Sequence, residues 1–139
     1  MWYTISVGND LKGENIMMRT ELTPRYLKQQ SFHKKAHILS ENDVYMLESY
    51  TTIVMKYNKT TRVLEICGDY SAATRRHQWE FMCWLEDTFN GEYFTNVYHF
   101  ICGAEKMKSF AKFLREVSEI DLVNHTYKLT QSGEVKKFI

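Results

Sequence analysis

Apolar and polar side chains alternate along several segments of the first half of the chain, the period of a β-strand with one buried face. The segments with this pattern, or with many β-branched and aromatic residues, are 1–7, 16–22, 36–39, 44–47, 50–57 and 62–66. Pro24 and the polar connector 25–30 interrupt the pattern. Turn residues at Ser40–Asp43 and Asn58–Thr61 separate the later segments, so residues 36–66 predict an antiparallel meander of three or four strands.

A helical period replaces the alternation after Gly68. Ser71 is a suitable N-cap and Asn90-Gly91 a suitable end, which predicts a helix from about Ala72 to Phe89. One side of this helix carries an apolar arc of Thr74, Phe81, Met82, Leu85 and Phe89. The opposite side carries Arg76, Glu80, Cys83 and Asp87. We therefore expect the first side to pack on the sheet.

The second half of the chain adds three further elements. Residues 92–101 are dense in aromatic side chains and predict a strand, which Gly103 ends. A second amphipathic helix is predicted from the helical spacing of Met107, Phe110, Ala111, Leu114 and Val117. Leu122–Leu129 and Glu134–Ile139, joined at Gln131–Gly133, predict a closing hairpin. The expected fold is α+β, a single domain over residues 1–139: an antiparallel β-sheet meander packed by two amphipathic helices, with a C-terminal hairpin.

Composition and charge narrow the function classes. The 139 residues include 44% hydrophobic and 25% charged side chains, which is typical of one folded domain. A net charge of +1 supplies no long-range field for a polyanion and disfavours broad nucleic-acid binding. Cys67, Cys83 and Cys102 are odd in number and widely spaced, so we expect reduced thiols at core positions. No apolar run has the length of a membrane span and no signal-peptide layout is seen, which predicts a cytoplasmic protein.

The start of the predicted helix has an unusual charge pattern. Arg75, Arg76 and His77 occupy its first turn or so, where the helix macrodipole disfavours cations. Together with free amides and the hydroxyls of Ser71 and Thr74, they form a candidate seat for a phosphate or carboxylate. The alternative is that both arginines point into water, with Asp69 and Glu80 offsetting their charge.

Aromatic residues flank the same helix. Arg75 lies near Trp79 and His77 near Trp84, an arrangement that can stack on a base or clamp a partner loop, or else borders a buried stripe. The five histidines have no carboxylate or cysteine at zinc-ligand spacing, so no metal is expected. No nucleophile elbow, phosphate loop or glycine fingerprint appears, and no enzyme is expected.

Four segments form a pattern that extends over about residues 22–90: Leu22–Tyr26, Ser31–Ala36, Ser49–Val54 and Tyr70–His77. In order and spacing they resemble a family of small uncharacterised bacteriophage proteins. The resemblance implies a phage origin and an α+β fold. The residues that carry over are Arg25, Tyr26, Phe32, Lys35, Tyr50, Thr52, Ser71, Thr74, Arg76 and His77. The candidate anion-binding or partner-binding residues are therefore Ser71, Thr74, Arg75, Arg76, His77, Arg25, Lys35, Tyr50 and Trp79.

These observations lead us to expect a non-enzymatic bacteriophage accessory protein. It would act in the host cytoplasm by binding a host factor, such as a defence component. Two alternatives stay open. One is a sponge for a phosphorylated small molecule or nucleotide, with Arg25 and Lys35 as additional cations; the other is weak nucleic-acid binding. No cofactor is expected, and the sequence leaves the oligomeric state open.

Overall fold

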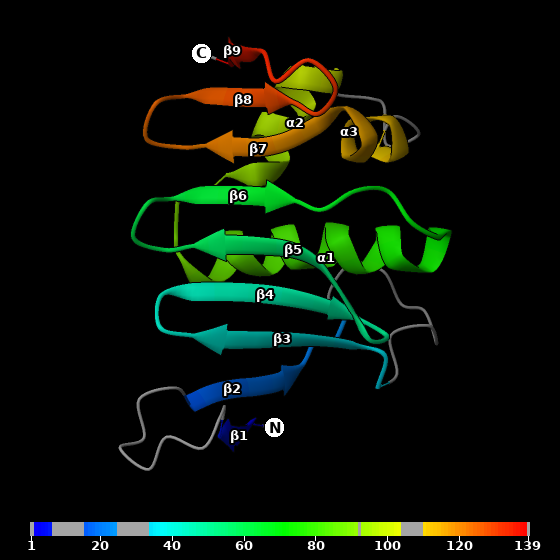
Figure 1. Ribbon diagram of the computed structural model, residues 1–139, viewed down its shortest axis with the longest axis vertical. Coiled ribbons are helices and arrows are strands. Elements are labelled where there is room, and N and C mark those ends of the chain that lie inside the picture. Colours follow the sequence, from blue (N-terminus) through cyan, green and yellow to red (C-terminus); the bar gives the residue numbers. More distant parts are fainter. Residues whose placement is uncertain (1, 7–15, 25–33, 92, 104–109, 139) are drawn as a thin grey trace.

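A large antiparallel sheet forms the body of the computed structural model, which describes residues 2–6, 16–24, 34–91, 93–103 and 110–138. Within these ranges nine strands pair in chain order (Figure 1). They are β1 (Trp2–Ser6), β2 (Ile16–Glu21), β3 (Ala36–Glu41), β4 (Val44–Ser49), β5 (Thr52–Asn58), β6 (Val63–Ile66), β7 (Val117–Asp121), β8 (Thr126–Leu129) and β9 (Val135–Lys137). The α+β class and the C-terminal hairpin are thereby confirmed. Arg25, the connector 25–30 and Met107 lie outside the described residues.

The alternating pattern sets the register of the central strands. Ile38 pairs with Leu47, and both are buried under the helices. A register shift between Leu47 and Glu48 then allows Ser49 to pair with Thr52 across a two-residue turn. Because successive side chains of a strand point to opposite faces, Ser49 lies on the same face of β4 as Leu47, and both are buried. That position proves important for the site described below.

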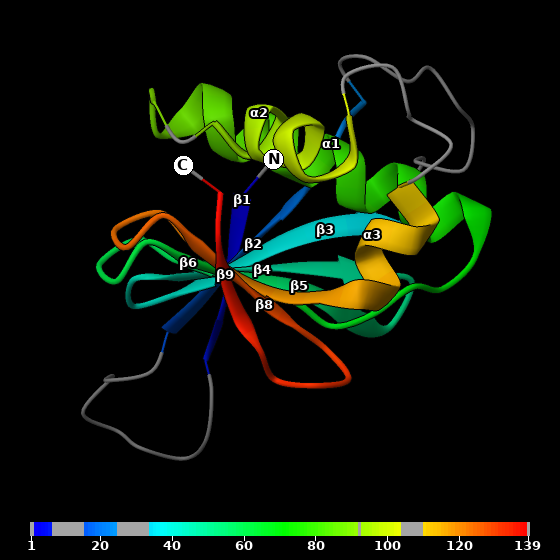
Figure 2. The same cartoon turned by 90° about the horizontal axis from the view of Figure 1, so that it is seen from above.

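Helices cover one face of the sheet (Figure 2). They are α1 (Ala72–Thr88), α2 (Phe94–Cys102) and α3 (Phe110–Glu116). Their buried residues share one core with the strands; among its fully buried members are Leu47, Met55, Leu64, Phe81, Leu85, Phe94, Tyr98 and Ile120. The opposite face carries no helix in the described part of the chain. The amphipathic pattern of α1 therefore correctly predicted Leu85 as a core residue.

The prediction of a strand over residues 92–101 is wrong, since this segment contains α2, and the number of helices is three rather than two among the described residues. Phe94, Val97 and Tyr98 are spaced by three and four residues, and all are buried. Tertiary packing of this helical face overrides the strand preference of aromatic and β-branched residues. In addition, the Glu86 carboxylate of α1 accepts a hydrogen bond from the Thr95 amide at 2.8 Å, which satisfies a free donor at the start of α2.

Three smaller expectations are also corrected. Val117 begins β7 instead of continuing the last helix. Glu80 and Cys83, expected on the open side of α1, are buried with exposed fractions of 1% and 7%. The reason is that α2 packs against α1, as the contact of the Trp79 and Tyr98 rings shows, so α1 is covered on more than its sheet side. Cys67 is exposed rather than part of the core.

Candidate functional site

A chain of hydrogen bonds joins the start of α1 to the end of β4. The Ser71 hydroxyl caps the helix by accepting from the Thr74 amide at 3.2 Å and donates to Thr74 Oγ1 at 3.3 Å. Thr74 Oγ1 lies 2.8 Å from Ser49 Oγ, which in turn lies 2.8 Å from His77 Nδ1. If each hydroxyl passes its one proton onward, Ser49 donates to Nδ1 and the ring proton of His77 is on Nε2.

This cluster is internal. Ser49, Thr74 and His77 have exposed fractions of 2%, 5% and 0%. The imidazole has no exposed surface, and the cluster joins α1 to the sheet through hydrogen bonds made inside the protein. Sequence reasoning missed Ser49 because no local pattern indicates that α1 packs over this end of β4 and brings Thr74 and His77 to its hydroxyl.

Two other predicted residues complete the cluster. The Tyr50 ring lies 5.8 Å from the His77 ring, and Lys35 Nζ lies 5.9 Å from the Tyr50 ring centre. Tyr50 has a φ of 58°, an unusual backbone angle for a large side chain, and its ring stays 45% exposed. The structure thus brings Lys35 and Tyr50 from earlier segments of the chain to Ser71, Thr74 and His77 at the start of α1.

Arg75, the first cation of α1, is paired within the chain. Arg75 donates to Asp69 Oδ1 at 2.9 Å and to the Tyr70 carbonyl at 3.1 Å. Arg115 of α3 donates to the other Asp69 oxygen at 3.0 Å, so this carboxylate lies between two guanidinium groups. Arg76 is half-buried.

The Trp79 ring packs against other aromatic rings. Its ring meets the Tyr98 and Phe110 rings edge to face, each at 5.3 Å between ring centres. Asp69 therefore balances the charge of Arg75, and Trp79 borders a buried aromatic stripe. These are the two structural alternatives that the sequence left open.

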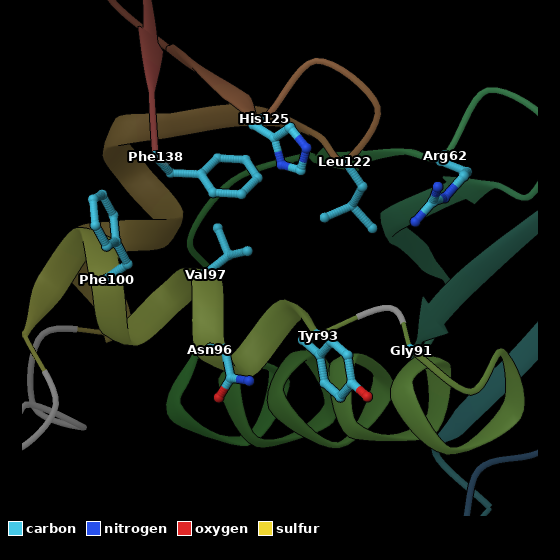
Figure 3. A pocket seen from close by; sticks show the side chains of 9 residues that line it. All are labelled: Arg62, Gly91, Tyr93, Asn96, Val97, Phe100, Leu122, His125 and Phe138. Atoms are coloured by element: carbon cyan, nitrogen blue, oxygen red, sulfur yellow. The ribbon is translucent and has the colours of Figure 1, made fainter.

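A second site lies between α2 and the loops of the C-terminal strands. It is a pocket of about 340 Å³, which we call the α2 pocket (Figure 3). Its lining residues are Arg62, Gly91, Tyr93, Asn96, Val97, Phe100, Leu122, His125 and Phe138. Val97, Leu122 and Phe138 are buried and form its floor. The rim is exposed, and the rings of Tyr93 and Phe100 are open to solvent by 58% and 64%.

Two similar loops, residues 58–62 and 121–125, form the wall opposite α2. In one, Asn58 Oδ1 accepts from the amides of Thr60 and Thr61. In the other, Asp121 Oδ1 accepts from the amides of Val123 and Asn124. The hydrogen bonds from Asn124 are the largest cause that lowers the pKa of Asp121 below its ordinary value.

Each of these loops ends on a residue in the left-handed region, Arg62 with φ 58° and His125 with φ 57°. Backbone hydrogen bonds hold both residues in place: Leu122 N donates to Arg62 O at 3.1 Å, and Phe138 N donates to His125 O at 3.0 Å. The ring centres of His125 and Phe138 are 5.7 Å apart. The two left-handed residues therefore place a guanidinium and an imidazole at the same pocket.

The comparison with protein families decides where this chain belongs. The model of a family of unknown function, DUF8033, matches residues 20–95, which is more than half of the chain. The chain is a member of DUF8033. Neither the curated proteins nor the solved structures contain a match to it.

The DUF8033 match covers β2 to the first turn of α2 and so contains the whole Ser49–His77 cluster. Most of the α2 pocket lies beyond it, from Asn96 to Phe138. Sequence reasoning missed this pocket because it assigned a strand to α2. The signal that was available is the helical spacing of Tyr93, Asn96, Val97 and Phe100, which share one side of a helix.

Among the described residues, no group of three or more His, Cys, Asp or Glu side chains is placed to hold a metal ion. No helix in the described ranges has the length and hydropathy to cross a membrane.

Proposed function

We propose that this DUF8033 protein is a non-enzymatic binding protein that docks a partner protein at the α2 pocket. The observation that carries the proposal is the contrast between a buried apolar floor and a rim of two widely exposed aromatic rings, Tyr93 and Phe100. Exposed aromatic side chains around an apolar depression are typical of protein interfaces, where one anchor side chain of the partner fills the depression.

The arrangement of polar groups supports binding over catalysis. The hydroxyl–imidazole cluster with Ser49 and His77 is enclosed in the core. In the α2 pocket, His125 is the histidine among the described lining residues, and no serine, cysteine or carboxylate of that lining stands beside it as a nucleophile or a partner base.

The nature of the partner is suggested by the sequence resemblance to small bacteriophage proteins. A phage protein of this kind meets the proteins of the infected cell, so we propose a host factor as the partner, and a component of host defence as a specific case. The site of action would then be the host cytoplasm.

A capture experiment with two matched variants tests the proposal. Phe100→Ser removes an exposed ring from the pocket rim, and Val135→Ser removes an exposed apolar side chain, 58% open, from strand β9, at a position that is not part of the pocket lining. Both variants should stay folded because exposed positions change stability little. We expect the wild type and Val135→Ser to capture the same host protein and Phe100→Ser to lose it. Equal capture by the wild type and both variants would contradict docking at this pocket.

The phosphate-sponge and nucleic-acid alternatives have less geometric support. Arg75, the first cation of the proposed anion seat, is already paired with Asp69. A thermal-shift screen with nucleotides and cyclic dinucleotides decides the first alternative, since a ligand that binds the native state raises the melting temperature. Steep salt dependence in a mobility assay is the mark of the second.

A further inference from the structure

We propose that the partner adds a strand to the outer edge of β9, with acidic side chains beside the β9 lysines and an apolar side chain at the α2 pocket. This inference rests on the proposed docking function and specifies the form and charge of the partner. β9 is the last strand of the described sheet, at its upper end in Figure 1. Phe138, the residue directly after β9, lines the α2 pocket (Figure 3).

The hydrogen bonds of β9 show which of its backbone groups point outward. Phe138 N donates to the carbonyl of His125, the residue before β8, at 3.0 Å. In an antiparallel pair the direction of these groups alternates along the strand, so Phe138 and Lys136 direct theirs toward β8, and Val135 and Lys137 direct theirs away from it. In the part of the chain that the structure describes, no backbone group pairs with this outer side. Unpaired donors and acceptors along an edge are a template for another strand.

The side chains of β9 favour an acidic partner. Lys136 and Lys137 are exposed, and neither forms an ion pair with another described residue. Successive side chains alternate in direction, so Lys136, which pairs with Tyr127, is on the face with the helices and Lys137 is on the open face. A carboxylate on either face of an added strand would therefore lie next to a lysine, and opposite charges on neighbouring strands stabilise the pairing.

The same lysines disfavour a second copy of this chain as the occupant. If two β9 strands paired antiparallel about their middle residue, Lys136 of one copy would face Lys136 of the other. Like charges directly opposite each other destabilise a strand pair. Lysines on edge strands are a common device against pairing between copies. The charge of this edge therefore selects against the chain itself and for an acidic strand of a different protein.

A strand added to β9 would also reach the α2 pocket. Neighbouring strands lie roughly 4.8 Å apart, and a partner residue opposite Phe138 would have its side chain on the same face of the sheet as the Phe138 ring. In Figure 3, Phe138 and the exposed Phe100 ring lie at the same end of the pocket. Main-chain hydrogen bonds to β9 would supply affinity and the pocket would select the apolar side chain, as in other complexes formed by strand addition.

The test uses the full chain and a library of random linear peptides. Enriched peptides are synthesised, and their binding is measured by fluorescence anisotropy. We expect them to combine acidic residues with an apolar one. Each backbone amide of such a peptide is then N-methylated in turn. Because only every second amide of an added strand points to β9, methylation should weaken binding by roughly tenfold at alternate positions and have little effect at the positions between them.

Lys137→Pro is the corresponding change in the protein. It removes an N–H group that points away from β8, and proline is tolerated where an edge strand turns its N–H outward. Lys137→Ala is the matched control, since it removes the same charge and keeps the N–H. We expect Lys137→Pro to bind the peptides roughly tenfold more weakly than Lys137→Ala. Val135→Ser keeps the backbone groups of β9 and should bind like the wild type. Thermal melting checks that the variants are folded, and the methylation series decides the question if Lys137→Pro is not.

The outcomes separate this inference from the docking function. Methylation effects that do not alternate, or equal binding by folded Lys137→Pro and Lys137→Ala, would overturn strand addition; the docking site stays if Phe100→Ser still loses the peptides. Alternation together with full binding to Phe100→Ser would keep the strand and overturn its contact with the pocket. A library that enriches nothing, or only peptides without acidic residues, would overturn the proposed partner. A dimer of the chain that Lys137→Pro abolishes would make a second copy the occupant and also overturn it.

Discussion

Backbone strain at Arg62 can be measured separately from the interactions of its side chain. The comparison is between Arg62→Gly and Arg62→Ala, because both remove the guanidinium and only glycine accepts the φ of 58° without steric cost. A left-handed angle costs a residue with a Cβ roughly 1–2 kcal/mol. Glycine loses about 0.4–1 kcal/mol of this advantage through its greater freedom in the unfolded chain. We therefore expect Arg62→Gly to exceed Arg62→Ala by about 1 kcal/mol in the free energy of unfolding.

Urea denaturation gives the free energy, provided that the slope with denaturant is the same in both variants. The same pair at His125, with φ 57°, should show a similar difference. Lys59 is the matched control, an exposed residue of the same loop that is not among the positions with positive φ, and there glycine should be the less stable of the two.

The reasoning fails if Arg62→Gly is no more stable than Arg62→Ala, or if Lys59 shows the same preference for glycine. If it holds, Arg62→Gly also separates stability from binding. The variant keeps a relaxed backbone and lacks a side chain that lines the α2 pocket, so it should fold well and bind the partner poorly. A substitution that raises stability and weakens binding indicates a residue that is retained for function.

Four further predictions concern the core and its dependence on pH. Ser49→Ala leaves the partners of a buried hydroxyl without a hydrogen bond and should cost about 1–3 kcal/mol in urea denaturation, whereas the same change at the exposed Ser132 should cost little. Leu85→Ala, at a fully buried position, should cost about 2–5 kcal/mol, and a loss below 1 kcal/mol would contradict its place in the core. The pKa of His37 is lowered from 6.5 by burial and then by Arg19; the unfolded chain therefore binds the proton more readily, and stability should fall as the pH decreases below 6.5, less so in His37→Gln. The lowered pKa of Asp121 stabilises the fold above its ordinary value of 3.8, and this contribution should disappear at lower pH in the wild type and be absent from Asp121→Ala.

The elements that the sequence predicted well are those whose pattern is local. The hairpin of β3 and β4 follows from alternation around a turn, and α1 follows from its cap and its apolar arc. α2 could not be predicted in this way, because its aromatic composition favours a strand and its helical form depends on burial of Phe94 and Tyr98. The Glu86 carboxylate that satisfies its first turn comes from another helix, which no local pattern indicates.

In the candidate sites, too, the features set by local sequence were predicted and those set by tertiary packing were not. The residues around His77 were predicted from an unusual charge pattern and a family resemblance, and five of them do lie together. Their chemistry was not predictable, because the imidazole is buried by the packing of α1 against β4, which brings His77 to the Ser49 hydroxyl. Arg75 is paired with Asp69, and Arg115, which is 46 residues further along the chain, contacts the same carboxylate. Contacts at such separations are set by the tertiary fold.

Strand order follows chain order, and this has a consequence for how the molecule assembles. Each strand of the described sheet pairs with its neighbours in chain order, and β6 and β7 are separated by the 50 residues from 67 to 116, which contain α1, α2 and α3. By the logarithmic cost of loop closure, joining ends across such a span costs roughly 2 kcal/mol more than closing a four-residue turn. Pairing of β6 with β7 should thus be a late event in folding. Arg62 precedes that junction and Leu122 follows it, so the α2 pocket exists only after the two parts of the chain have met.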